Sequence, residues 1–396
     1  MDLFKAEHKK LWSKISVKIS VVLCFAYGII FGSIFQYQWF AFGSSGDGTT
    51  LFENHFDGYE NIRKHQEYAG KYGSILNDES LSRMVLDYQE SSVELSDWRT
   101  FNTWLQTLFP ELKRSDMYQK LLVEYVDVTE LTGLYEKRQK VINDLIASSG
   151  ASEKEKEYLI SMNDKVDTPF QYAWTEGWMF LLQNQQYYGI MFAIVLVISL
   201  SPLFSGEWHD RTGAMILSMK NGWKEDALAK VMVGFAFSLE LFLIISIPSV
   251  IVQLILFGTS GWNMPIQNIS MAAIAPMNML QAEIYQYFHA LLGIIGFAGV
   301  IMFISSILKN EMGSLLVGFA ILFVPIVISK YLPYEIRLFS ELFPLVDDSS
   351  VIFRTDCLNI FGKIIWMPYL QLLIPPLFGI VCIPATIKLW SKRMRA

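Results

Sequence analysis

The sequence predicts an all-α polytopic membrane protein with six transmembrane helices and a mainly helical extracellular domain between helices 1 and 2. Three observations lead to this fold class. The 396 residues are 52% hydrophobic and only 18% charged, whereas soluble domains carry roughly 25% charged residues. Long runs of the chain lack charged side chains, and the lysines and arginines gather beside alternate runs.

The charge-free runs locate six spans. A bilayer core about 30 Å thick requires roughly 20 apolar residues per helix, and the first run is longer than the core of a signal peptide, so we expect it to be a retained span. The runs predict helices at 19–42, 185–204, 231–257, 285–308, 312–330 and 366–390.

The basic residues predict the orientation. Cytoplasmic loops of membrane proteins carry an excess of Lys and Arg. Residues 1–18 hold five lysines, the 205–230 loop holds four basic residues and the C-terminal end holds four more, whereas the 258–284 loop holds none. We therefore expect both termini in the cytoplasm and a multi-pass protein of the cell membrane. Segments 43–184 and 258–284 are then extracellular, and 331–365 is extracellular or re-entrant.

The two ends of the chain are short cytoplasmic segments in this interpretation. Within 1–18, Leu3, Phe4, Leu11 and Trp12 recur at roughly helical spacing with lysines between them. This pattern is typical of an amphipathic helix lying at the membrane surface, and a simple basic anchor is the alternative. Residues 391–396 form a cytoplasmic tail.

The predicted extracellular domain is acidic, and its apolar spacing indicates helices. Residues 47–176 carry 24 Asp and Glu against 14 Lys and Arg, which fits either a solvated surface or an attraction for cationic ligands. Apolar residues recur at three- and four-residue steps over 118–146 and predict one long amphipathic helix ending at Ser148-Ser149-Gly150. Other helices are expected to start at Asp78 and at Ser152.

Glycines and one carboxylate stand out within the spans. Gly28 and Gly32 form a GxxxG pair, and Gly293, Gly296 and Gly299 recur every three residues, which favours close helix packing or a dimer contact. Ordinary use of glycine in membrane helices is the alternative. Glu240 is expected ~15 Å inside helix 3, either in a transport cavity or in a structural hydrogen bond nearer the headgroups.

The 205–230 connector is the most specific segment. It carries a carboxylate and a guanidinium four residues apart, at Glu207 and Arg211, and then the apolar run 214–217. A solvated linker does not require such a run, so a protein partner or the inner leaflet is expected to cover it. The sequence contains no GxxxxGK[ST], no HExxH and no CxxC, so we expect no catalytic residues, no metal site and no cofactor in this chain.

These features together resemble the permease subunit of type 2 ABC exporters. The resemblance rests on Leu203-Phe204-Ser205-Gly206-Glu207, then Arg211-Thr212-Gly213-Ala214, Met215-Ile216-Leu217-Ser218 and Lys230 before helix 3. The family's Gly-Thr type pair occurs here in reverse order, as Thr212-Gly213. The large insert after helix 1, with Tyr72-Gly73-Ser74-Ile75-Leu76-Asn77-Asp78-Glu79, is similar to extended members from Gram-positive bacteria.

The resemblance implies partners and a mechanism. Two permease chains, expected to be identical, pair in the lipid membrane with two cytosolic ATPase subunits that carry ATP and Mg. No nucleic acid is involved. The coupling residues implied are Glu207, Arg211, Thr212, Gly213, Met215 and Leu217. The substrate implied is an amphipathic, antimicrobial or toxin-like peptide, exported by alternating access.

Two other functions are compatible with the sequence. The chain could be a membrane-anchored sensor or immunity protein that binds a ligand through its extracellular domain without transport. A polytopic enzyme such as an acyltransferase would require His and Asp clustered at one membrane face, and the five histidines are scattered.

Overall fold

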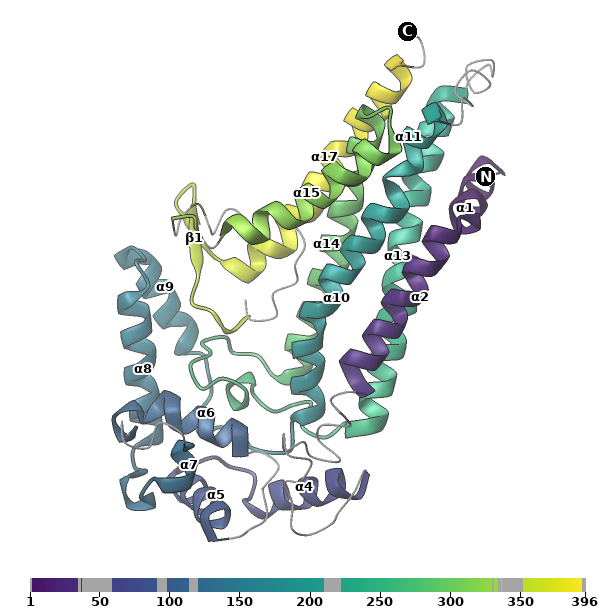
Figure 1. Ribbon diagram of the computed structural model, residues 1–396. Coiled ribbons are helices and arrows are strands. Elements are labelled where there is room, and N and C mark those ends of the chain that lie inside the picture. The colour runs from purple at the N-terminus through teal and green to yellow at the C-terminus, as the bar shows by residue number, and fades with distance from the viewer. Residues whose placement is uncertain are drawn as a thin grey trace.

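The computed structural model describes residues 2–34, 37, 59–90, 98–113, 120–209, 222–329, 331–333, 336 and 352–393. It is mostly helical, at 78%, and six helical segments are long and apolar enough to cross a membrane. These features confirm a predominantly helical, multi-pass membrane architecture. Figure 1 shows both termini at one end of the helix bundle and the domain of α4 to α9 at the other.

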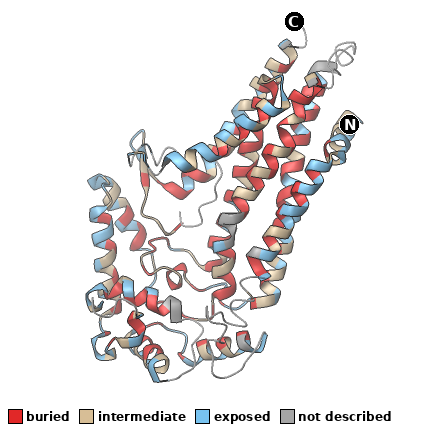
Figure 2. Cartoon of the chain, in the orientation of Figure 1, coloured by how far each residue is buried: buried red, intermediate tan, exposed pale blue. Residues whose placement is uncertain are grey.

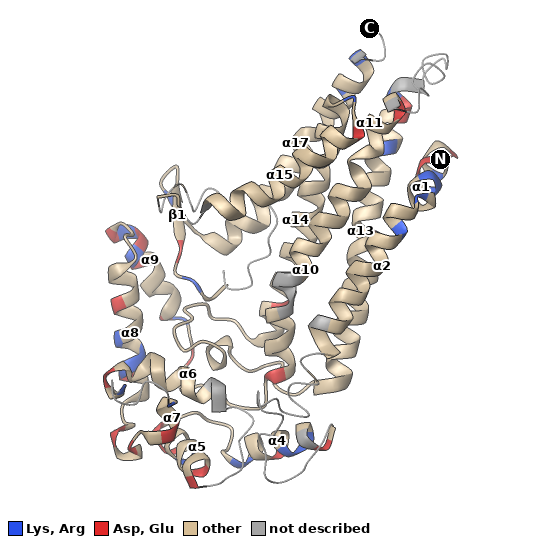
Figure 3. Ribbon diagram, in the orientation of Figure 1, with Lys and Arg blue, Asp and Glu red and all other residues tan. Residues whose placement is uncertain are grey.

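The membrane bundle surrounds two central helices. The central helices are α10 (Glu176–Leu200) and α14 (Met279–Ile307), which have the largest buried share of the six spans. Around them pack α2 (Ile15–Ile29), its π-helical continuation Ile30–Ile34, α13 (Gly222–Phe257), α15 (Glu311–Ser329) and α17 (Met367–Arg393). Figure 2 shows buried residues along the facing sides of the bundle, and Figure 3 shows charged residues mainly at its two ends.

The second span is broken and then continues. Pro202 starts α11 (Pro202–His209) directly after α10, and proline has no N–H for the helical ladder. The Ser305 hydroxyl on α14 compensates for the break, because it accepts hydrogen bonds from Phe204 N and Ser205 N at 3.0 and 3.2 Å and donates to Ser201 O at 2.5 Å. The helix therefore extends past residue 204, where we expected it to end.

Glycines set the closest helix approaches. A Cβ on Gly296 would lie 2.2 Å from the Pro375 carbonyl oxygen, and one on Gly299 would lie 2.5 Å from Gly379 Cα, so α14 and α17 pack backbone to backbone. Gly28 accepts a hydrogen bond from the Tyr188 hydroxyl at 3.0 Å. These contacts lie within one chain.

The other two predicted glycines also lie in the bundle. Gly293 lines a gap of about 20 Å³ beside His289. Gly32 is buried in the π-helical turn.

The domain between the first two spans is a cluster of helices. Most of their buried apolar side chains share one core, whereas Leu159 and Met162 belong to a second core together with Trp178 and Met264. The helices of the domain are α4 (Tyr59–Lys71), α5 (Asp78–Glu90), α6 (Trp98–Leu108), α7 (Leu122–Tyr125), α8 (Leu134–Ser148) and α9 (Glu153–Asn163), with 3-10 turns at Pro110–Leu112 and Val128–Glu130. The expected starts near Asp78 and Ser152 are confirmed.

The single long helix expected over 118–146 was wrong. The segment breaks before α8 because Gly133 adopts a left-handed conformation (φ 73°). The Asp78 carboxylate stabilises the break, since it accepts hydrogen bonds from Gly133 N and Leu134 N at 2.8 and 2.9 Å. An acceptor from a different helix thus caps α8, which the apolar spacing of the segment could not reveal.

Buried hydrogen bonds join the domain to the segment between α13 and α14, which contains a 3-10 turn at Ile266–Asn268. Arg138 on α8 is 3% exposed and donates to the carbonyls of Met271 and Ala273 at 2.9 and 2.8 Å. Burial lowers the pKa of Arg138 to about 10, so the guanidinium remains charged at neutral pH. Trp104 on α6 donates to the Asn268 carbonyl at 3.0 Å.

A β-hairpin precedes the last span, in addition to the expected helices. Strands β1 (Cys357–Ile360) and β2 (Lys363–Trp366) pair antiparallel, and Phe361 and Gly362 make the turn with φ of 51° and 84°. Two left-handed residues form the tight turn that matches the twist of a hairpin. The predicted all-α fold class did not include this hairpin.

The packing of α14 on α17 predicts that Gly296→Ala destabilises the protein. The added methyl meets backbone atoms that cannot rotate away, and overpacking typically costs about 1–3 kcal/mol. Gly313→Ala in α15 is the matched control, because its nearest neighbour would lie 3.8 Å away. Thermal unfolding in detergent should show a lower midpoint for Gly296→Ala only. Equal midpoints for the two variants would contradict this packing.

Burial of His65 in α4 predicts a pH-dependent stability. Desolvation lowers the pKa of His65 from 6.5 to about 4. Between these pH values the unfolded chain binds a proton that the folded chain does not, so stability falls as the pH falls. The full shift corresponds to about 3 kcal/mol.

The unfolding midpoint from pH 7.5 to 4, compared between wild type and His65→Phe, isolates this effect. The variant should lose less stability than the wild type as the pH falls through this window. Parallel profiles would show that His65 titrates alike in both states.

Candidate functional site

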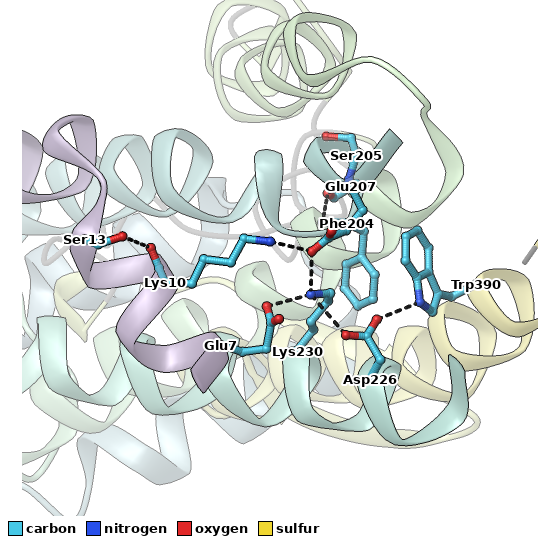
Figure 4. A network of polar contacts seen from close by, with 10 residues as sticks. Glu7, Lys10, Ser13, Phe204, Ser205, Glu207, Asp226, Lys230 and Trp390 are labelled. Atoms are coloured by element: carbon cyan, nitrogen blue, oxygen red, sulfur yellow. Dashed lines mark hydrogen bonds and ion pairs between the residues drawn. The ribbon is translucent and has the colours of Figure 1, made fainter. Parts of the chain in front are cut away.

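A buried lysine at the end of the bundle near the termini collects three carboxylates. Lys230 on α13 is 0% exposed, and its ammonium group lies 2.6 Å from Glu7, 2.9 Å from Glu207 and 3.2 Å from Asp226 (Figure 4). A lysine ammonium has three donors, so each can face one carboxylate. We call Lys230, Glu7, Glu207, Asp226 and Lys10 the charge cluster.

Three helices supply the charge cluster. Glu7 and Lys10 lie one turn apart on α1 (Asp2–Ser13), and Lys10 forms an ion pair with Glu207 at 2.6 Å. Glu207 lies on α11, and Asp226 precedes Lys230 by one turn on α13, so α13 presents both on one side. Removing a charge from water costs several kcal/mol unless opposite charges compensate it. The cluster therefore requires the three helix ends to meet.

Aromatic side chains connect the charge cluster to the last span. Trp390 on α17 donates its indole N–H to Asp226 at 3.0 Å, and its ring meets Phe204 and Trp208 edge-on at centroid distances of 5.2 and 6.0 Å. Lys309, in the turn between α14 and α15, lies 5.0 Å above the Trp208 ring. The cluster is thus enclosed on the side of α17.

The α1 helix has a second anchor on α13. Glu240 accepts hydrogen bonds from Trp12 Nε1 at 2.8 Å and contacts His8 Nε2 at 2.8 Å. The Glu240 side chain is 37% exposed, and the Trp12 ring packs edge-on against Phe237. Of the two roles considered from the sequence, the structural hydrogen bond is the one these contacts describe.

The structure describes one of the six coupling residues expected from the sequence. Glu207 lies in the charge cluster, on a helix rather than in a loop, because α11 continues to His209 and α13 begins at Gly222. Five others lie outside the described residues: Arg211, Thr212, Gly213, Met215 and Leu217. The connector between the two helices is therefore shorter than 205–230.

Sequence reasoning missed several members of the charge cluster. Asp226 and Lys230 carried a usable signal, since opposite charges four residues apart support a helix. Glu7, Lys10 and Trp390 carried none, because they contact residues of α11 and α13 that are far away in the sequence.

The site consists of charge pairs within one chain. Within the described ranges, no group of three or more His, Cys, Asp or Glu side chains is placed to hold a metal ion. Each charge that enters the cluster is held by an opposite charge of the same chain. The cluster can therefore fix the geometry of α1, α11 and α13 as a unit.

Comparisons with known proteins identify no relative. No protein-family model, curated protein or solved structure matches the chain.

The charge cluster predicts that Lys230→Met destabilises the protein strongly. The substitution leaves two buried carboxylates and the partly buried Glu7 without their central counter-charge, and breaking a buried ion pair by removing one partner costs about 3–5 kcal/mol. Lys224→Met is the matched control, because Lys224 is exposed on the same helix. Thermal unfolding in detergent should separate the two variants, and adding Glu207→Gln and Asp226→Asn to Lys230→Met should restore part of the loss. An unchanged midpoint for Lys230→Met would contradict the cluster.

Proposed function

We propose that this chain is the permease subunit of an ATP-driven exporter, in which a separate ATPase contacts the segment between α11 and α13. The observation that carries the proposal is the charge cluster. It fixes the two helix ends from which this segment leaves and ties them to α1, while Trp390 ties Asp226 to α17. A partner that displaces the segment would thereby act on several spans together.

The distribution of charge supports the orientation in this proposal. The termini and α11 lie at one end of the bundle, and the domain of α4 to α9 lies at the other (Figure 1). The end with the termini carries the basic segments, as cytoplasmic ends do. We propose that this end faces the cytoplasm, where ATP is available, and that the domain faces outward.

The chain has no phosphate-binding motif of its own, so hydrolysis belongs to the partner. In the proposed assembly two copies of this chain pair with two ATPase subunits that bind ATP and Mg. Closure of the ATPases would switch a path between the two permeases from one side of the membrane to the other. The substrate class we propose is an amphipathic peptide.

A charged substitution in the apolar part of the connector tests the proposal. We expect Met215→Asp with Leu217→Asp to weaken association with a co-expressed ATPase at least tenfold, because central apolar contacts carry most of the binding energy of an interface. Leu145→Asp is the control, since Leu145 is 42% exposed on α8 in the other part of the molecule. Co-purification and ATP hydrolysis by the complex are the measurements.

Two results would overturn the proposal. In the first, the wild-type chain does not associate with the co-expressed ATPase. In the second, the connector variant associates as well as the wild type does.

A membrane-anchored receptor without transport is the second candidate. The favouring observation is a cleft of about 370 Å³ between the segment that precedes α10 and the segment that joins α13 to α14. A receptor would bind its ligand there with an affinity that does not change when ATP and the ATPase are added.

A further inference from the structure

The cleft on the domain side of the bundle has walls from two connecting segments. One wall is the 165–171 segment, which leads into α10, and the other is formed by residues between 263 and 281, which join α13 to α14. Its volume of about 370 Å³ lies at the lower end of the range for ligand pockets. The position places any ligand against the ends of the two central helices.

Side-chain amides dominate the polar lining of the cleft. They are Gln171, Asn263, Gln267, Asn278 and Gln281. An amide offers both a carbonyl acceptor and NH₂ donors, so the cleft resembles the backbone of a protein chain in its hydrogen-bonding character. Its ligand should therefore carry both donors and acceptors.

Hydrogen bonds within the protein determine which donor and acceptor groups of these amides remain for a ligand. Asn278 and Gln281 form a capping box at the start of α14, in which each side-chain oxygen accepts from the backbone N–H of the other residue at 2.9 to 3.0 Å. Their NH₂ groups remain as donors. Gln267 is 0% exposed and donates to Ala273 O and Ala275 O, while its Oε1 has no hydrogen-bond partner among the described residues.

The charge of the lining excludes strongly charged ligands. Lys165 and Asp167 are its two formal charges, and they cancel. The acidic character of the domain as a whole therefore does not extend into the cleft. An uncharged polar segment fits better than a polyamine or a phosphate.

The apolar part of the lining favours a peptide over a sugar. Phe170 is the aromatic residue among the described lining residues, and it is 1% exposed, with its ring against Tyr135 and under the Arg138 guanidinium. It therefore offers no open ring face for a sugar to stack on. Three prolines, Val166 and Met277 supply the remaining apolar surface among the described lining residues, and methionine adapts to varied side chains.

We infer that this cleft binds an uncharged, extended peptide segment through its amide side chains. Its role in loading a transported peptide rests on the proposed function, whereas the binding itself does not. A bound peptide would bridge the 165–171 segment and the α13–α14 connection, both of which continue directly into central helices of the bundle. Peptide recognition and bundle geometry are thereby coupled.

Binding to the full chain in lipid nanodiscs, without ATPase or ATP, tests the inference. The probe is a pool of terminally blocked, uncharged tetrapeptides, with maltotetraose and spermine as comparison ligands, observed by saturation-transfer NMR. We expect signals from peptides only. Absence of peptide binding, or stronger binding of maltotetraose, would overturn the assignment, and neither result would bear on association with the ATPase.

Two variants of lining residues test whether the peptide binds in the cleft. Met277→Trp fills the cleft and should weaken peptide binding at least tenfold, whereas the matched control Met312→Trp, at a 64% exposed position on α15, should bind as the wild type does. Asn263→Leu changes an exposed lining residue without a hydrogen bond among the described residues and should also weaken binding. Wild-type binding in both cleft variants would show that the peptide binds elsewhere.

Discussion

The interaction on which the end of the bundle depends is the burial of the Lys230 ammonium group. A lysine removed from water is stable only if opposite charges replace its hydration. Glu7, Glu207 and Asp226 do so, and two of them come from other helices. The position of a single side chain therefore fixes where α1 and α11 meet α13.

This pairing determines how a displacement of the segment between α11 and α13 would act on the bundle. The two helices that flank this segment, α11 and α13, are joined by the charge cluster. In addition, α11 is hydrogen-bonded to Ser305 on α14. A force on the segment would reach both helices together rather than bend one of them alone. Under the proposed function, that is the mechanical property a coupling element requires, and α1 belongs to the same unit through Lys10 and Glu240.

The sequence revealed the spans better than their ends. Apolar runs close to the thickness of a bilayer in length identified all six helices that are long and apolar enough to cross a membrane, because a helix satisfies its own backbone hydrogen bonds in hydrocarbon. The ends were misplaced beside Glu207 and Lys230, because these charges were taken as the edges of spans, whereas paired charges allow a helix to continue.

Other features depend on contacts between distant residues and left no local pattern. The Asp78 cap at Gly133 divides an apparently continuous amphipathic helix. The sequence showed Glu240 as a charge within a predicted span, but it did not show the partners of Glu240 on α1. The charge cluster itself combines one local pair, Asp226 and Lys230, with members that only the fold brings together.

The two ends of α10 differ in the kind of chemistry they meet. At one end, α11 continues it into a charge cluster whose groups are satisfied by one another. At the other end, it follows a cleft lined by amides whose hydrogen-bonding capacity is partly unused. Satisfied groups favour a fixed structure, whereas groups with remaining capacity favour a ligand. Between the two ends of the bundle, the close backbone approach of Gly296 to Pro375 joins α14 to α17, so these two helices would move together as one packed unit rather than bend separately.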